Sequence, residues 1–235
     1  MNSLQLTMDF ALDKETSLAN YYTFGNEDLL NQLKAFVKEP AEKPADALLF
    51  LHSPTGCGKS HLLQALCQYA YEIGISNQYL PLHVFSHYEV EATMGMEQFP
   101  LLLIDDIDAL KHNPAWQEAI FDLINRVLEK QGKIIFAADN TVENLGLSLP
   151  DLISRLQWGQ TWALTPLDDE YQIEMMIFRA KCKGMTLSDE VAQYIHTRLS
   201  RDPKSIIRCL EKLDKASLEE QRRLTIPFIK QLMRW

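Results

Sequence analysis

The residues best suited to chemistry lie in the segment Ser53-Pro-Thr-Gly-Cys-Gly-Lys-Ser60, between an apolar run and a helical pattern. A loop of this kind presents successive backbone N–H groups to phosphate at the start of a helix, and its lysine reaches the terminal phosphates. The Ser60 hydroxyl is suited to bind Mg²⁺. Ser53 replaces the first glycine of the usual motif, which narrows the allowed backbone angles there. The segment predicts a nucleotide-phosphate site formed by Thr55, Gly56, Cys57, Gly58, Lys59, Ser60 and His61.

A second group of chemically useful residues follows the apolar run at 101–104, in the sequence LLLIDDID. A carboxylate at the end of a buried strand beside a phosphate loop is placed to hold Mg²⁺ through water, and this role falls to Asp105. Asp106, the next residue, is a candidate for orienting the attacking water. Its side chain is one methylene shorter than the glutamate usually found there, so we expect slow hydrolysis at best.

Apolar runs of strand length alternate with helical patterns over the first two thirds of the chain. Such an alternation indicates an α/β domain whose parallel sheet is covered on both faces. Asn26 and Asn113 are expected to cap helices, the second one followed by Pro114. The sequence predicts five strands, at 47–52, 80–85, 101–105, 133–139 and 160–165, and helices at 26–37, 61–73, 114–127 and 150–157.

The pattern changes from Pro166 onward, where helical segments follow one another without strands. They are expected at 168–182, 188–200 and 203–217, with a short last helix after Thr225. The sequence therefore predicts three parts: an N-terminal tail at 1–20, a nucleotide-binding α/β domain at 21–165 and a small all-helical domain at 166–235.

Composition excludes several classes of function. The 235 residues carry a net charge of −9, which argues against broad attachment to the phosphate backbone of DNA as the main activity. No apolar run reaches the length of a membrane span, and the first twenty residues lack the basic start of a secretory signal, so we expect no membrane partner and a cytoplasmic protein. The four cysteines lie far apart without metal-ligand spacing, and we interpret them as small buried residues.

The motifs SPTGCGKSHLLQA, LLLIDDID, FAADN and PDLISRLQWGQTWAL together resemble the AAA+ module of the bacterial replication initiator DnaA. The likeness runs from about residue 20 to the end of the chain. We expect no counterpart of the helix-turn-helix DNA-binding domain that DnaA carries after this module. In this respect the chain is similar to the short DnaA-related AAA+ proteins that inactivate DnaA. The resemblance implies ADP or ATP with Mg²⁺ as ligands, and a helical lid as the second domain.

The resemblance also implies roles for single residues. Asp139, at the end of the fourth expected strand, matches the polar sensor position beside the terminal phosphate. Arg155 matches the arginine finger, which in AAA+ assemblies enters the nucleotide site of the neighbouring subunit. A finger of this type is worth about 10³ to 10⁵ in rate in GTPases. Lys204 falls at the second sensor, where arginine is usual; a lysine keeps the charge and loses the planar fork.

The N-terminal tail contains the hexapeptide QLTMDF at 5–10. It resembles the short motif by which bacterial replication proteins attach to the sliding clamp. An extended peptide can lay Leu6, Met8 and Phe10 into an apolar cleft while Gln5 forms a hydrogen bond at its rim. Taken alone, the same alternation also fits an ordinary edge strand. The position just ahead of a DnaA-like module favours clamp binding, and the clamp would bring the acidic protein to DNA indirectly.

The resemblance therefore predicts a negative regulator of replication initiation with two partners, the sliding clamp and ATP-bound DnaA. It would stimulate hydrolysis of the DnaA-bound ATP with Arg155 and have weak or no ATPase of its own. Two alternatives stay open: a self-sufficient AAA+ ATPase or helicase loader, and an adaptor that binds DnaA without a catalytic arginine. Self-association also stays open.

Overall fold

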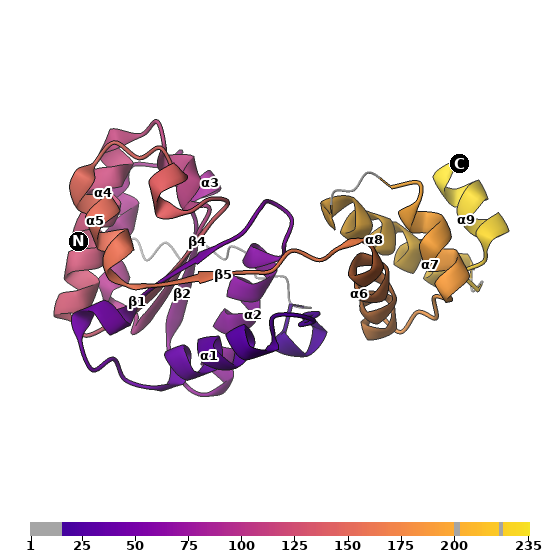
Figure 1. Ribbon diagram of the computed structural model, residues 1–235, viewed down its shortest axis with the longest axis horizontal. Coiled ribbons are helices and arrows are strands. Elements are labelled where there is room, and N and C mark those ends of the chain that lie inside the picture. The colour runs from indigo at the N-terminus through magenta and orange to yellow at the C-terminus, as the bar shows by residue number, and fades with distance from the viewer. Residues whose placement is uncertain (1–15, 200–202, 221–222) are drawn as a thin grey trace, which may run out of the picture.

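The structure, a computed structural model, describes residues 16–199, 203–220 and 223–235. Its first part is built on a five-stranded parallel sheet (Figure 1) with the strand order β2-β3-β4-β1-β5. The predicted α/β class and the number of strands are confirmed. The strands are β1 (Leu48–His52), β2 (Asn77–Pro81), β3 (Leu101–Asp105), β4 (Lys133–Ala138) and β5 (Gln160–Ala163).

Helices cover both faces of this sheet and form the whole second part of the described chain. Those of the first part are α1 (Glu27–Lys38), α2 (Lys59–Glu72), the single turn α3 (Leu82–Phe85), α4 (Pro114–Glu129) and α5 (Pro150–Trp158). A short 3₁₀ turn, η1 (Leu18–Asn20), precedes them. The second part contains α6 (Asp169–Cys182), α7 (Asp189–His196), α8 (Pro203–Glu220) and α9 (Ile226–Met233).

Alternate residues of each strand enter two separate cores, as expected for a sheet buried on both sides. Leu48 and Phe50 of β1 belong to the core that contains the buried side chains of α4 and α5. Leu49 and Leu51 belong to the core beneath α1 and α2. Figure 1 shows the two pairs of helices on opposite faces of the sheet. Because the strands are parallel, their carboxyl ends share one edge of the sheet, and the residues that follow β1, β3 and β4 meet there.

The strand predicted at 80–85 is wrong. β2 starts three residues earlier, at Asn77, and ends at Pro81, which has no N–H to continue a ladder. Residues 82–85 form α3, a single helical turn in which Leu82 and Phe85 are both buried. A spacing of three residues brings two side chains to one side of a helix. The short apolar run is compatible with the side-chain spacing of a strand or of a helix. Pro81 ends the strand, and the residues after it form the helical turn.

The C-terminal helices form a lid domain with a core of its own, in which Met176, Ile195 and Leu213 are fully buried. Asn26 was expected to cap α1, but its side chain instead joins the connection between the two parts. It accepts a hydrogen bond from the backbone N of Thr165 at 2.9 Å and donates to the backbone O of Thr165 at 3.2 Å. The expected cap at Asn113 is present, because its side chain accepts from the backbone N of Trp116.

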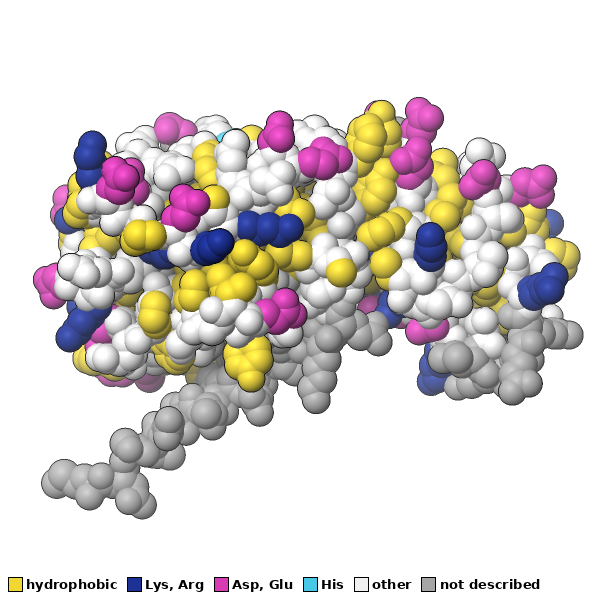
Figure 2. Space-filling view, turned by 90° about the horizontal axis from the view of Figure 1, so that it is seen from below, with side chains coloured by type: hydrophobic (Ala, Val, Ile, Leu, Met, Phe, Trp, Pro, Cys, Tyr) yellow, Lys and Arg dark blue, Asp and Glu magenta, His cyan; other side chains and the backbone are white. Residues whose placement is uncertain are grey.

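The surface fits an acidic protein. Figure 2 shows acidic side chains spread over both parts on the face drawn there, with Lys and Arg side chains interspersed among them. Cys67 and Cys209 are buried as expected and Cys57 is half-buried, but Cys182 is exposed, so that part of the expectation is wrong. Across the described ranges, no three His, Cys, Asp or Glu residues are grouped to hold a metal ion. None of the described helices is long and apolar enough to cross a membrane.

Candidate nucleotide-binding site

The predicted phosphate loop connects β1 to α2. Gly56 and Gly58 both have left-handed backbone angles, with φ of +89° and +87°, which glycine adopts without strain. A Cβ on Gly58 would also lie 3.4 Å from the ring of Tyr21. Gly58 is the residue before the first turn of α2, so the unpaired N–H groups of that turn are available to an anion. Ser60 is exposed in the same turn.

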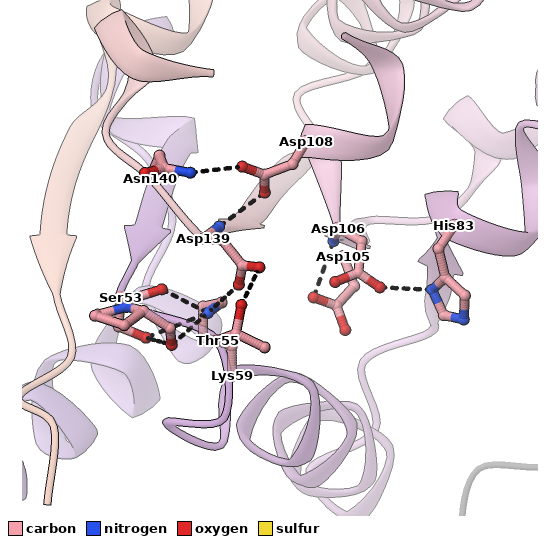
Figure 3. A network of polar contacts seen from close by, with 10 residues as sticks. Ser53, Thr55, Lys59, His83, Asp105, Asp106, Asp108, Asp139 and Asn140 are labelled. Atoms are coloured by element: carbon pink, nitrogen blue, oxygen red, sulfur yellow. Dashed lines mark hydrogen bonds and ion pairs between the residues drawn. The ribbon is translucent and has the colours of Figure 1, made fainter. Parts of the chain in front are cut away.

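Lys59 is only 6% exposed, and its ammonium group folds back onto the loop (Figure 3). Nζ donates to the backbone O of Ser53 at 2.7 Å and of Pro54 at 3.2 Å. It also forms a 2.8 Å ion pair with Oδ1 of Asp139, from the end of β4. The other carboxylate oxygen of Asp139 accepts a 2.5 Å hydrogen bond from the hydroxyl of Thr55. Asp139 therefore lies against the phosphate loop, and its role as a sensor stays a prediction.

Asp108 holds the segment that carries Asp139. Its Oδ2 accepts a 2.7 Å hydrogen bond from the backbone N of Asp139. Its Oδ1 lies 3.5 Å from the amide nitrogen of Asn140 (Figure 3). Asp108 is the last aspartate of the LLLIDDID motif, but its position there did not predict this role.

Asp105, the candidate magnesium residue, is completely buried at the end of β3. Its Oδ2 accepts a 2.6 Å hydrogen bond from the hydroxyl of Tyr79 on β2, and its Oδ1 accepts one from the backbone N of Asp106. Burial and the neighbouring Asp105 carboxylate raise the pKa of the Tyr79 hydroxyl. Tyr79 had no signal in the sequence, because its contact with Asp105 comes from the pairing of β2 with β3.

Asp106 points elsewhere. Its backbone is left-handed, with φ +57°, and its Oδ2 lies 2.5 Å from Nδ1 of His83 on α3. Figure 3 shows this pair apart from the Lys59–Asp139 pair. Burial and the Asp105 carboxylate raise the pKa of Asp106, and the contact with His83 acts in the opposite direction. The contact with His83 was not predicted, because residues 82–85 were expected to continue a strand and instead form α3.

A hollow of about 230 Å³ lies beside the phosphate loop, between the two parts of the chain. One wall is the loop, a second is the segment at 21–26, and a third is the start of the lid. The described residues that line it are Tyr21, Tyr22, Asn26, Pro54, Thr55, Gly56, Cys57, Gly58, His61, Thr165, Pro166, Leu167, Gln172, Met175, Arg179 and Ile207. The hollow thus combines a phosphate-type loop with mostly uncharged walls, which suits a nucleotide.

Arg155 is not among the residues that line this hollow. It lies on α5, half-buried, with its guanidinium carbon 4.9 Å from the ring centre of Trp158. With Phe121, Asp151, Ser154, Gln157 and Trp158 it lines a separate, open hollow of about 540 Å³. The structure therefore separates Arg155 from the loop of its own chain.

Gln117 of α4 fixes the start of α5 and was missed in the sequence. It is completely buried, and its Oε1 accepts hydrogen bonds of 2.9 Å from the backbone N of both Ser148 and Leu149. Its Nε2 donates to the backbone O of Leu110 at 2.7 Å. These contacts hold the turn from which the helix of Arg155 begins.

The structure describes the remaining predicted site residues only in part or not at all. Lys204 lies in the first turn of α8, and its side chain is outside the described part of the chain. Gln5, Leu6, Met8 and Phe10 also lie outside the described residues.

Two family models match separate segments of the chain. Residues 18–163 match the family model described as the bacterial DnaA ATPase domain, and residues 169–233 match the model described as "Hda, lid domain".

Several solved structures are similar in fold. Domain III of the Thermotoga maritima initiator DnaA is 19% identical, covers 94% of this chain and 97% of its own, and has a TM-score of 0.78. DnaA from Aquifex aeolicus bound to AMPPCP is 23% identical, with coverages of 88% and 67% and a TM-score of 0.71. The Thermotoga maritima RuvB Holliday junction branch migration motor is 18% identical, with coverages of 93% and 71% and a TM-score of 0.67.

At these identities the likeness to solved structures establishes the fold alone, an AAA+ α/β domain with a helical lid. The family models go further, because the first of them spans more than half of the chain. The chain belongs to the family of bacterial DnaA ATPase domains, and its lid is of the Hda type.

Proposed function

We propose that the chain binds ADP or ATP in the hollow beside the phosphate loop, with Mg²⁺ near Ser60 and Asp105. The left-handed glycines, the buried Lys59 and the uncharged walls support this proposal. So does the AMPPCP bound to the Aquifex aeolicus DnaA. Bound Mg²⁺ neutralises phosphate charge. A phosphate would replace the Asp139 carboxylate as the partner of Lys59. The backbone N–H groups from Gly56 to His61 would surround this phosphate.

We further propose that the protein is a negative regulator of replication initiation that stimulates hydrolysis of DnaA-bound ATP. The observation that carries this proposal is the position of Arg155. Its guanidinium lines an open hollow on α5 and not the nucleotide hollow of its own chain. A finger that acts on a neighbouring molecule has to be available in this way, and a guanidinium stabilises the charge that develops on the transferred phosphoryl group.

The chain's own ATP hydrolysis is expected to be weak. Asp106, the candidate for orienting a water, is short and is paired with His83 on the far side of Asp105 from Lys59. The nucleotide of this chain would then stabilise the fold and the lid rather than be turned over. Turnover would take place on DnaA, with Arg155 added to the partner's site.

Recruitment to DNA is assigned to the tail. The sequence QLTMDF at 5–10 would bind the sliding clamp as an extended peptide, with Leu6, Met8 and Phe10 in an apolar cleft. The net charge of −9 supports an indirect route to DNA, since the protein's own charge disfavours phosphate.

A reconstituted assay tests the proposal. DnaA loaded with radiolabelled ATP is mixed with clamp on primed DNA and with this protein, and ADP formation is followed. Stimulation that requires the clamp, the tail and Arg155 supports the regulator. Stimulation that persists without Arg155 identifies the adaptor, and turnover without DnaA that depends on Asp106 identifies the self-sufficient ATPase.

A further inference from the structure

Arg179 lies where three parts of the chain meet. It belongs to α6 of the lid, yet its Nη1 lies 3.0 Å from Nδ1 of His61 and donates to the backbone O of Asn20 at 3.2 Å. His61 is in the first turn of α2, two residues after Lys59, and its Nε2 lies 3.1 Å from Oδ1 of Asn20. One guanidinium therefore connects the lid, the helix that follows the phosphate loop, and η1.

Arg179 also lines the 230 Å³ hollow. Among the described residues that line it, Arg179 alone carries a permanent positive charge, and none carries a carboxylate. The ammonium group of Lys59 is directed to Ser53, Pro54 and Asp139 instead. The cationic part of the hollow's wall thus comes from the lid.

The chemistry of a guanidinium suits this place. A nucleotide carries negative charge only on its phosphates, and a guanidinium forms short, charge-assisted hydrogen bonds with phosphate oxygens through its planar fork. Its present partners, a carbonyl oxygen and an imidazole, lie within the first turn of α2 and the turn η1. A phosphate at the start of α2 would therefore lie on the side of Arg179 that faces the loop.

This inference rests on the proposed nucleotide site. We propose that Arg179 binds a phosphate of the nucleotide and that this contact holds α6 of the lid against α2. The position differs from that of Lys204, the second-sensor candidate in α8, and offers the planar fork that a lysine lacks. Coupling between two equilibria is reciprocal. Bound nucleotide would therefore stabilise the contact of α6 with α2 to the same extent that this contact strengthens nucleotide binding.

The test compares four proteins by isothermal titration with ADP: wild type, Arg179→Gln, Arg179→Lys and Arg208→Gln. Arg208 is an exposed arginine of the lid, on α8, and does not line the hollow. Loss of one charge-assisted phosphate contact should raise the Kd of Arg179→Gln about tenfold. Arg179→Lys should recover part of the affinity at low salt, because it keeps the charge and loses the planar fork. Arg208→Gln should bind as wild type does.

A second readout separates phosphate binding from a purely structural role. The ratio of the Arg179→Gln and wild-type Kd values should shrink as salt is raised, because screening weakens a charge contact. Hydrogen exchange of α6 should slow on addition of ADP in the wild type and much less in Arg179→Gln. A structural brace would behave differently: Arg179→Lys would not recover affinity, and both variants would melt early without nucleotide.

The outcomes distinguish the two proposals. If the wild type binds no ADP or ATP, the nucleotide site itself is wrong, and Arg179 has nothing to recognise there. If the wild type binds ADP and Arg179→Gln binds equally well, the site stands and the role of Arg179 is overturned. The brace outcome also overturns it.

Discussion

Lys59 Nζ lies 2.8 Å from Oδ1 of Asp139, so the lysine of the phosphate loop is paired with a carboxylate from the end of β4. Thr55 donates to the other oxygen of the same carboxylate. Asp139 thus contacts two residues of the loop, as a phosphate group would. Nucleotide binding has to break this pair or bring phosphate close to a carboxylate, and both cost free energy.

Lys59→Ala should weaken ADP and ATP binding at least tenfold, because a charged contact to phosphate is lost. Added nucleotide raises the melting temperature of the wild type by mass action, and this rise should be nearly absent in the variant. Differential scanning fluorimetry at increasing ADP concentration measures both proteins. An equal rise in the two would show that nucleotide binds elsewhere.

Asp139→Asn should have the opposite effect and tighten ADP binding severalfold. The amide keeps the shape of the side chain and removes the charge that competes for Lys59 and repels phosphate. Titration calorimetry measures the change. Asp122→Asn, which removes an exposed carboxylate from α4, is the matched control and should leave the affinity unchanged. Weaker binding by Asp139→Asn would mean that the carboxylate helps to build the site.

The phosphate loop and the aspartates after β3 could be predicted because their spacing along the chain fixes their chemistry. Arg155 came from the resemblance to DnaA. The contacts of these residues could not be predicted, since they join distant segments: Tyr79 reaches Asp105 through strand pairing, and Arg179 reaches His61 across 118 positions. Such contacts cannot be predicted from the pattern of neighbouring residues in the sequence.

Two predictions made from local sequence patterns, the helix cap at Asn26 and the strand at 80–85, differ from the structure. Asn26 has the sequence signature of a helix cap, yet its amide is bound to both backbone groups of Thr165. The apolar run at 80–85 was divided at Pro81 between a strand and a helical turn. At Asn26 a tertiary contact outweighed a weak local preference, whereas at 80–85 the missing N–H of Pro81 ended the strand.

Gln117→Leu should lower the free energy of unfolding by about 2 to 4 kcal/mol, because the backbone groups of Ser148, Leu149 and Leu110 would lose a buried partner. Urea denaturation measures the loss. Gln68→Leu, at an exposed position of α2, is the matched control and should change stability little. A negligible effect of Gln117→Leu would show that the turn before α5 is held by other contacts.

Replacing Gln5, Leu6 and Phe10 together with Ala should abolish clamp binding in surface plasmon resonance while leaving the melting temperature and ADP affinity unchanged. A recruiting tail contributes little to a domain's core. Replacement of Ser3, which precedes the motif, and of Thr7 and Asp9, which lie within it, is the control and should preserve binding. A large fall in melting temperature would instead identify the segment as a structural strand.

Arg155→Ala should leave this protein's stability, clamp binding and ADP affinity unchanged, because Arg155 lies outside the hollow of its own chain. It should nevertheless lower the stimulation of DnaA-bound ATP hydrolysis a hundredfold or more, since one charged donor at the developing negative charge is worth about 10² to 10³ in rate.

Two further variants complete this test. Arg155→Lys should recover little of the stimulation, because a point charge on a flexible stem does not reproduce the planar fork. Arg208→Ala, at an exposed lid position, should stimulate as the wild type does. The measurement is ADP released from preloaded DnaA with excess clamp on DNA. Full stimulation by Arg155→Ala would remove the arginine finger from the mechanism and leave a protein that acts by binding DnaA.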